Sequence, residues 1–397
     1  MTDIVLPPLV LRTIEPLVYR VPLETPVQTS FGIMHDRPAL LLRVTDADGV
    51  EGWGEVWCNF PAVGAEHRAR LVVSVLAPLA LGKSWRSPQA LFQALTQQTA
   101  VLAIQSGEPG PLAHVIAGLD IAAWDLAARR AGMPLWKLLG GSSDRIRVYA
   151  SGLNPDGPER LAAERQAEGY AAFKLKVGFG EERDLANLAA LRERLGAGAT
   201  LMVDANQAWS SEQAIALLPQ LEPFELAWLE EPLRADRPWY EWQSLQAVSA
   251  IPLAAGENVA GAEAFEQAIS AGALAVVQPD LAKWGGFSGC LPVARRVLDA
   301  GLRFCPHYLG GGIGLLASGH LLAAAGGDGM LEIDANPNPL RTLLWGPLAA
   351  VHNGHCELGA GIGIGCVPDL EAIARYRIDV AMARTSKPLS DFTPDRS

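Results

Sequence analysis

Residues 171–177, AAFKLKV, form a short apolar segment with two lysines near its C-terminal end. Alternate residues of a strand share one face, so Lys174 and Lys176 are expected on the same side. Burying an unpaired cation costs several kcal/mol, so the pair needs either solvent or a chemical use. The segment is one unit of a pattern that continues along the chain.

Short β-rich segments alternate with alanine-rich amphipathic helices from residue 146 onward. This alternation is typical of parallel strands joined by right-handed crossovers. We expect strands at residues 148–151, 171–177, 200–206, 226–232, 252–258, 275–280, 302–307 and 330–334. Eight is the strand number of a closed (β/α)8 barrel, although a doubly wound open sheet would show similar alternation.

Seven of these strands end in, or close to, a side chain capable of chemistry. These side chains are Lys176, Asp204, Glu230, Glu257, Asp280, His307 and Glu332. Successive members lie 23 to 28 residues apart, about one strand-helix unit. In a barrel the strand ends meet around one rim, where active sites are built, whereas an open sheet would spread them along a line. The pattern therefore favours an α/β barrel.

Three successive strands deliver Asp204, Glu230 and Glu257. Such a cluster of carboxylates repels itself unless a hard cation lies among them, and an open catalytic site suits Mg2+ better than Ca2+. Glu231 is expected on the opposite face as a structural partner, although the sequence leaves open which of the two glutamates binds metal. Asn206 either contacts the substrate or a metal-bound water, or caps the strand end.

Two candidate bases lie on strands roughly opposite one another in such a barrel. Lys174 is expected to lower the pKa of Lys176 by repulsion, and the alternative is two lysines that extend to solvent. Asp280 and His307 end adjacent strands and form a candidate dyad. A carboxylate substrate between these bases would lose its α-proton to give an enediolate. Glu332 would donate a proton to that intermediate if protonated, or be a salt-bridged acid.

The composition limits the other functional classes. The net charge of -11 and the lack of a basic run argue against nucleic-acid binding. Five widely spaced cysteines predict a reduced protein without disulfides. The N-terminus does not resemble a signal peptide, and no apolar run has the length of a membrane span. We therefore expect a cytoplasmic protein without a membrane partner.

The segments before residue 146 have a different texture. Residues 40–56 predict two strands around an ADG turn, and residues 111–141 predict a long helix that ends near Gly132 and Gly140. The first part of the chain therefore resembles a small meander followed by helices, unlike the alternation that begins at residue 146.

The order and spacing of seven short motifs carry a family resemblance. The motifs are KLK (174–176), VDAN (203–206), EEP (230–232), GEN (256–258), PD (279–280), PH (306–307) and LEID (331–334). Together they resemble the enolase superfamily, and within it the mandelate racemase subgroup. The resemblance implies a (β/α)7β barrel of residues 140–369 and an N-terminal α+β capping domain of residues 1–130, to which residues 370–397 return. Sites of this superfamily use a Lys or His base with Mg2+.

The resemblance also implies roles for individual residues. Asp204, Glu230 and Glu257 would bind Mg2+, with Glu230 preferred over Glu231. Lys176 would be one acid/base catalyst, with Lys174 lowering its pKa and contacting the substrate carboxylate; the Asp280 and His307 dyad would be the other, and Glu332 the proton donor. A capping loop would add specificity through Phe31, Met34 and His35. Assembly into a homo-oligomer is implied as well.

Two reactions fit a base on each side of the substrate. Dehydration of a sugar acid to a 2-keto-3-deoxy acid is favoured, because relatives with this Lys and His pair are mostly dehydratases. The alternative is a racemase or epimerase of a 2-hydroxy acid such as mandelate, with 1,1-proton transfer between Lys176 and His307. A Schiff-base aldolase would not need the three acids, and a non-catalytic metal-binding barrel would not need the bases.

Overall fold

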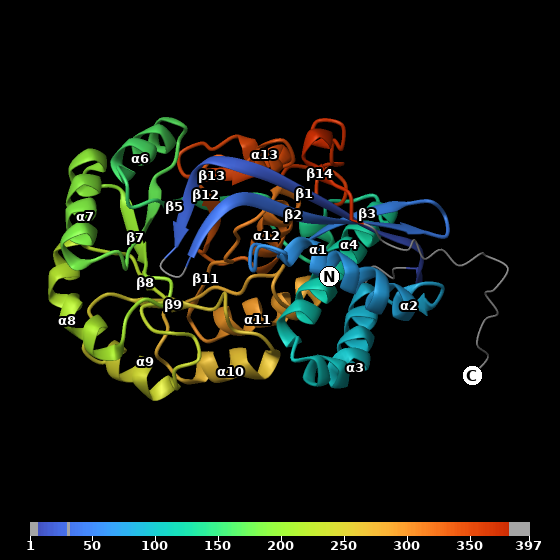
Figure 1. Cartoon of the computed structure of the whole chain (residues 1–397), viewed down its shortest axis with the longest axis horizontal. Coiled ribbons are helices and arrows are strands. Elements are labelled where there is room, and N and C mark those ends of the chain that lie inside the picture. Colours follow the sequence, from blue (N-terminus) through green and yellow to red (C-terminus); the bar gives the residue numbers. More distant parts are fainter. Residues whose placement is uncertain (1–6, 30–31, 381–397) are drawn as a thin grey trace.

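The computed structural model describes residues 7–29 and 32–380. Eight parallel strands follow one another in the order β11-β10-β9-β8-β7-β6-β5-β12 (Figure 1). They are β5 (Arg145–Leu153), β6 (Ala172–Lys176), β7 (Thr200–Asp204), β8 (Leu229–Glu230), β9 (Leu253–Ala255), β10 (Val276–Val277), β11 (Arg303–Phe304) and β12 (Met330–Asp334). All eight predicted strands are confirmed. A short strand, β13 (His355–Glu357), pairs antiparallel with β5.

The ends of this sheet, β11 and β12, lie against one another. The Met330 N–H donates to Cys305 Sγ over 3.4 Å. Gly329 packs so close to the Phe304 carbonyl that a Cβ at this position would lie 1.8 Å from its oxygen. The sheet therefore curls into a nearly closed barrel, and the predicted fold class is confirmed.

Helices connect the strands. Most of them are amphipathic and bury an apolar stripe, whereas α12 is apolar and buried on all sides. In α7, for example, Leu188, Leu191 and Leu195 are buried while the charged residues between them are not. The helices are α6 (Pro158–Ala167), α7 (Glu181–Leu195), α8 (Ser211–Leu221), α9 (Trp239–Gln246), α10 (Ala262–Ser270), α11 (Gly286–Asp299), α12 (Gly312–Ala325) and α13 (Pro339–Thr342), with the 3-10 turns η2 (Glu222–Phe224) and η3 (Gly346–Ala349).

A second sheet, in the order β14-β1-β2-β3, forms the α+β cap. Its strands are β1 (Leu9–Thr29), β2 (Gly32–Asp46), β3 (Glu51–Val56) and β14 (Arg377–Ile378), and β4 (Ser84–Trp85) pairs with β1. The predicted hairpin within residues 40–56 is confirmed. Its helices are α1 (Gly64–Leu71), the π-helical turn η1 (Val72–Leu76), α2 (Ala77–Ala80), α3 (Pro88–Ser106), α4 (Pro109–Arg130) and α5 (Leu135–Leu138).

Helix α4 packs directly on β3. Cβ atoms at Gly52 and Gly54 would lie 2.3 and 2.2 Å from the carbonyl oxygens of Ala122 and Gly118, so the two glycines permit this close approach. The helix is long and apolar enough to cross a membrane, but 78% of its most apolar window is buried inside the fold. It is the core helix of the cap.

The C-terminal part of the chain returns to the cap. After the 3-10 turn η4 (Ala374–Tyr376), β14 pairs antiparallel with β1, with Val18 opposite Ile378 and Tyr19 opposite Arg377. The exact division into domains at residues 130, 140 and 370 stays a prediction.

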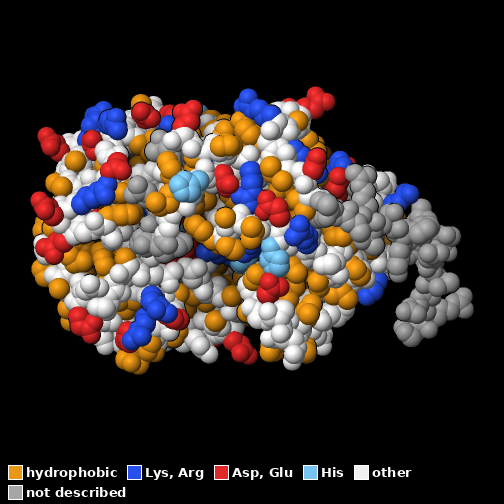
Figure 2. Space-filling view, in the orientation of Figure 1, with side chains coloured by type: hydrophobic (Ala, Val, Ile, Leu, Met, Phe, Trp, Pro, Cys, Tyr) orange, Lys and Arg blue, Asp and Glu red, His pale blue; other side chains and the backbone are white. Residues whose placement is uncertain are grey.

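On the face shown in Figure 2, acidic and basic side chains are interspersed with hydrophobic ones. All five cysteines are free, and four of them are buried.

A ring of buried side chains fills the barrel interior, one from each strand or from the residue beside it. The ring consists of Tyr149, Ala172, Met202, Trp228, Ala254, Val276, Cys305 and Met330. Because side chains alternate along a strand, the residues two positions further on also point inward, one layer closer to the C-terminal rim. This ring is the floor on which the candidate site rests.

Candidate active site

The layer above the floor is polar. Its members, each two residues beyond a floor residue, are Ser151, Lys174, Asp204, Glu230, Gly256, Gln278, His307 and Glu332. The strand register places Lys176 beside Asp204 and Asp204 beside Glu230. Counted around the barrel, β6 and β11 lie five strands apart in one direction and three in the other. The lysines and His307 therefore approach from nearly opposite walls.

Both lysines are ion-paired with carboxylates. Lys174 is fully buried, and its Nζ lies 2.5 Å from Glu230 Oε1 and 2.8 Å from Glu332 Oε1. Lys176 Nζ lies 2.5 Å from Asp204 Oδ2. Opposite charges at this distance favour the protonated ammonium.

The predicted lowering of the lysine pKa is wrong for this arrangement. Burial is the largest influence on the pKa of Lys176 and lowers it, and Lys174 lowers it further as expected. The Asp204 and Glu230 carboxylates together raise this pKa, and the net shift is upward. Burial likewise lowers the pKa of Lys174, while Glu230 and Glu332 raise it well above its usual value. Sequence reasoning found the like charges because they are neighbours, but not the carboxylates from other strands.

His307 forms the predicted pair with Asp280. Its Nδ1 lies 2.8 Å from Asp280 Oδ2, and its Nε2 contacts Glu257 Oε2. Burial lowers the pKa of His307, but Glu257, Glu332 and Asp280 raise it well above the usual value. The imidazole is therefore held in the protonated form, with Asp280 fixing its orientation.

The surroundings of Glu332 favour the second of its two predicted roles, a salt-bridged acid, over that of a protonated donor. Burial raises the pKa of Glu332, but Lys174 and His307 lower it to a net value below the ordinary one. The Ser151 hydroxyl donates to Oε1, and the Tyr308 N–H donates to Oε2 over 3.2 Å. In this arrangement Lys174, and not Glu332, holds a proton.

Two acids, Glu231 and Glu257, reach the site because the backbone beside them departs from the regular alternation of side chains along a strand. Glu231 was expected on the outer face, but its φ of 39° turns the chain there, and it is buried. Burial, Glu257 and Asp204 raise its pKa well above the usual value. Gly256 also has a positive φ, 150°, and turns Glu257 inward. The expectation for Glu231 was wrong because positive φ ends the period-two pattern.

The side-chain amide of Asn258 joins these two acids. Its Nδ2 donates to Glu231 Oε1 over 2.9 Å and to Glu257 Oε1 over 2.8 Å. Lys283 completes this edge, with Nζ 3.5 Å from Glu257 Oε1 and 4.8 Å from the centre of the Trp57 ring. Neither Asn258 nor Lys283 was identified from the sequence, although both are within three residues of a predicted site residue.

The acidic cluster fits a divalent cation in charge and donor chemistry. Six carboxyl groups of the site face four basic groups, so the acids outnumber the bases by two. A divalent cation would favour the ionised forms of Glu230 and Glu231, whose pKa values are raised in its absence. The acids are Asp204, Glu230, Glu231, Glu257, Asp280 and Glu332, and the bases are Lys174, Lys176, Lys283 and His307. Oxygen-only donors of this charge are those that Mg2+ prefers.

The carboxylates are not arranged as a ready-made cage. Within residues 7–29 and 32–380, no group of three His, Cys, Asp or Glu side chains converges on a metal position. Glu230 Oε2 accepts hydrogen bonds from Trp228 Nε1 and Gln278 Nε2 over 3.0 and 2.7 Å, and burial raises the pKa of Glu230 to about 7. Metal binding would therefore require Asp204 and Glu257 to exchange their basic partners for the cation.

Asn206 is buried next to Asp204. Its backbone N–H donates to Asp204 Oδ1 over 2.8 Å, and its side-chain amide lies 3.2 Å from Oδ2.

Three residues of the cap domain were predicted to contribute to specificity. Phe31 lies outside the described residues, Met34 is buried and His35 is exposed. Arg37 ties the β2 strand to the barrel rim, with its guanidinium 2.6 Å from Asp334 Oδ2.

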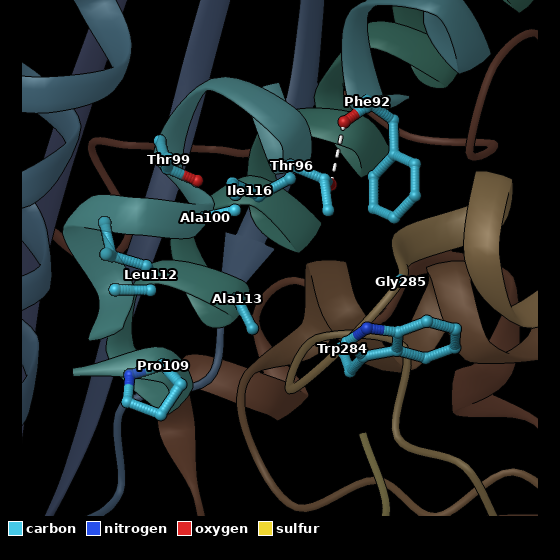
Figure 3. A pocket seen from close by; sticks show the side chains of 11 residues that line it. Phe92, Thr96, Thr99, Ala100, Pro109, Leu112, Ala113, Ile116, Trp284 and Gly285 are labelled. Atoms are coloured by element: carbon cyan, nitrogen blue, oxygen red, sulfur yellow. Dashed lines mark hydrogen bonds between the residues drawn. The ribbon is translucent and has the colours of Figure 1, made fainter. Parts of the chain in front are cut away.

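Two aromatic residues near strand ends face away from the site. Trp284 lines an apolar cleft of about 160 Å³ between the cap helices α3 and α4 and the β10–α11 loop (Figure 3). Trp209 lines a separate surface cleft of about 590 Å³ beside Arg234 and Tyr240. Neither tryptophan therefore makes the candidate site apolar.

Two family sequence models match this chain. Residues 158–373 match the sequence model of the enolase C-terminal domain-like family, and residues 13–140 match that of the mandelate racemase / muconate lactonizing enzyme N-terminal domain. The chain belongs to the mandelate racemase/muconate lactonising enzyme family of the enolase superfamily. The predicted family is confirmed, and the chain is an enzyme of lyase or isomerase type.

Curated relatives of this enolase-superfamily member act on sugar acids and their derivatives. A D-galactarolactone cycloisomerase of Agrobacterium fabrum is 32% identical, over 90% of this chain and 96% of its own. A D-galactonate dehydratase of Xanthomonas euvesicatoria is 32% identical, over 71% of this chain and 74% of its own.

Solved structures extend the likeness to the whole fold. A mandelate racemase/muconate lactonizing enzyme from Bordetella bronchiseptica is 57% identical, with a TM-score of 0.89 over 93% of this chain and 99% of its own. A Streptomyces coelicolor racemase with bound magnesium is 29% identical, with a TM-score of 0.82 over 93% of this chain and 100% of its own.

Proposed function

We propose that this enzyme dehydrates a sugar acid to a 2-keto-3-deoxy acid by magnesium-dependent removal of the proton next to the carboxylate. The observation that carries the proposal is the pair of proton-transfer groups on nearly opposite walls, with a cluster of carboxylates between them. The D-galactonate dehydratase and the D-galactarolactone cycloisomerase among its relatives support a sugar acid as the substrate class.

Asp204, Glu230 and Glu257 would hold the metal. Bound there, Mg2+ would attract the substrate carboxylate and stabilise the negative charge that develops on it. Asp204, once engaged in coordination, would no longer raise the pKa of Lys176, and the opposing effects of burial and Lys174 would then lower it. Lys176 would become a base only in the loaded site.

Lys176 would take the α-proton of the substrate. Lys174 would hold its own proton and donate a hydrogen bond to the substrate carboxylate, because Glu332, which is not among the proposed metal ligands, keeps its ammonium charged. Charge-assisted donors of this kind stabilise an enediolate more than the starting carboxylate. Glu332 would position Lys174 instead of donating a proton.

His307 would act as the general acid that protonates the departing hydroxyl group. As the electron pair left by the α-proton forms the carbon–carbon double bond, the C3–O bond breaks, and the imidazolium Nε2–H gives its proton to the departing hydroxide to form water. The resulting enol tautomerises to the keto acid. Asp280 keeps the imidazole oriented for this transfer.

The experiment is incubation of the protein with a panel of sugar acids and Mg2+ in D2O. Formation of a keto acid, lost on addition of EDTA and restored by Mg2+, is the expected result. Turnover that survives EDTA would contradict the proposal and indicate Schiff-base chemistry instead.

Racemisation or epimerisation of a 2-hydroxy acid is the second candidate, favoured by the same opposed pair of groups. Its sign would be a deuterium atom at the α-carbon of an inverted substrate without keto acid. Mandelate belongs in the panel for this reason.

A further inference from the structure

The segment that follows His307 is held by side chains from the cap. The stretch YLGGGIGLL, residues 308–316, runs from the end of β11 into helix α12. Glu55, near the end of β3 in the cap, is 2% exposed and lies against this segment.

Both oxygens of Glu55 accept backbone hydrogen bonds at the start of α12. The Gly311 N–H donates to Oε1 over 2.5 Å, and the Gly314 N–H donates to Oε2 over 2.8 Å. The first N–H groups of a helix have no partner within it, and the helix dipole favours a negative charge there. The Glu55 carboxylate of the cap thus supplies hydrogen-bond acceptors and a negative charge at the N-terminus of α12.

Glu55 also reaches the neighbour of His307. The Tyr308 hydroxyl is hydrogen-bonded to the Glu55 carboxylate, while the Tyr308 N–H donates to Glu332. The residue after His307 is therefore fixed on its side chain by the cap and on its backbone by β12.

The glycines of the segment make this arrangement possible. A Cβ at Gly311 would lie 2.7 Å from Glu55 Oε1, and a Cβ at Gly314 would lie 2.1 Å from the Tyr308 hydroxyl oxygen. Asn59 adds a further hydrogen bond from the cap, to the Leu309 carbonyl oxygen over 2.7 Å. The segment is shaped to receive a cap carboxylate.

We propose that Glu55 is a positioning residue for His307: it holds Tyr308 and the start of α12 so that the imidazole faces the substrate. The proposal rests on the function proposed above for His307, but not on the identity of the substrate. The contacts of Glu55 are with Tyr308 and the α12 N-terminus, so it would act through them.

The test compares Glu55→Gln and Glu55→Asp with Asp125→Asn. Asp125 is the control, since it is a fully buried cap acid that also accepts two backbone N–H groups, from Trp53 and Ile364; unlike Glu55, it is in addition ion-paired with an arginine, Arg129. In Glu55→Gln, the amide nitrogen cannot accept a backbone N–H, so one of the two bonds to α12 is lost. Glu55→Asp keeps the charge.

The first measurement needs no substrate. In full-length protein labelled with 15N-histidine, the Nδ1 signal of His307 is assigned by its loss in His307→Gln. We expect this signal to shift or broaden in Glu55→Gln, to recover partly in Glu55→Asp, and to stay unchanged in Asp125→Asn.

The second measurement uses the sugar acid that the panel identifies. We expect kcat to fall about 10- to 100-fold in Glu55→Gln with KM within about twofold, because a small misplacement of a catalytic group costs this much. An unchanged His307 signal in Glu55→Gln, or an equal change in Asp125→Asn, would overturn the proposal. Because the first measurement is independent of turnover, failure of the proposed function is distinguishable from failure of this one.

Discussion

The two walls of the site are supported in different ways. On the lysine wall, the loop after β6 is held within its own unit, since Asp184 of the next helix accepts the N–H groups of Gly178 and Phe179 over 2.8 and 3.3 Å. On the histidine wall, the corresponding loops are held by cap acids more than 160 residues away in sequence, Asp120 at α11 and Glu55 at α12.

The difference separates local from long-range determinants of the chemistry. The loop after β6 is held by the helix of its own β/α unit, so the placement of Lys174 and Lys176 depends on folding of the barrel alone. The placement of His307 additionally requires the cap to dock. If Glu55 positions His307 as proposed, the contact between cap and barrel also influences the distance between the two proton-transfer groups.

The largest effect is expected when either wall loses its proton-transfer group. Lys176→Met and His307→Gln should each lower kcat by about 10²- to 10⁴-fold, the usual contribution of a general acid or base. Steady-state kinetics with the sugar acid found by the panel provides the measurement, with thermal melting as the control for folding. A variant of either residue with near wild-type kcat would contradict the assignment of one proton-transfer group to each wall.

Removal of the buried ammonium on the lysine wall comes next. Lys174→Met should destabilise the fold by about 3–5 kcal/mol, since Glu230 and Glu332 would lose their shared cation in a buried site. Denaturant unfolding measures this loss. Lys283→Met is the control: its partly exposed pair with Glu257 should contribute about 1 kcal/mol or less. Equal losses in the two variants would contradict the difference in burial.

A smaller loss is expected on the histidine wall from Gly314→Ala. The added methyl group would collide with the Tyr308 hydroxyl oxygen, and overpacking of this kind costs about 1–3 kcal/mol. Gly198→Ala, where a Cβ would meet nothing within 4 Å, is the matched control and should change stability by about 0.5 kcal/mol or less. Unfolding curves that do not separate the two variants would argue against a tight segment after His307.

The last prediction concerns the pH dependence of the cap contact at α11. Burial raises the pKa of Asp120 from its ordinary value of 3.8 to about 7, while its bonds from Ser288 lower it. At a pH between these two pKa values, Asp120 keeps a proton in the folded state that it has released in the unfolded state. The free energy of unfolding therefore falls as the pH rises. The slope from this group is about 1.4 kcal/mol per pH unit at most.

Asp120→Asn removes this titration. The free energy of unfolding of the variant should therefore improve relative to wild type as the pH rises from about 4 to about 7. Denaturant unfolding at several pH values makes the comparison. Parallel curves for the two proteins over this range would show that Asp120 does not titrate there.

Sequence reasoning could predict what depends on alternation within one strand. The eight strands and the inward direction of Lys174, Asp204 and His307 follow from period two. Glu231 could not be placed in this way, because its positive φ breaks the alternation. The lysine pKa values were misjudged because the decisive carboxylates come from other strands. Glu55 gave no signal, since its partners lie about 250 residues further along the chain.

The pairing of β14 with β1 has a consequence for how the molecule is made. One neighbour of the first strand is contributed by residues 377 and 378, near the end of the chain. During synthesis, domains usually fold from the N-terminus as they emerge. Here the cap sheet gains its last strand only after the ribosome has finished the barrel. The cap sheet is therefore complete only after the barrel sequence has been made, and removal of residues 377 and 378 would leave this edge of β1 unpaired.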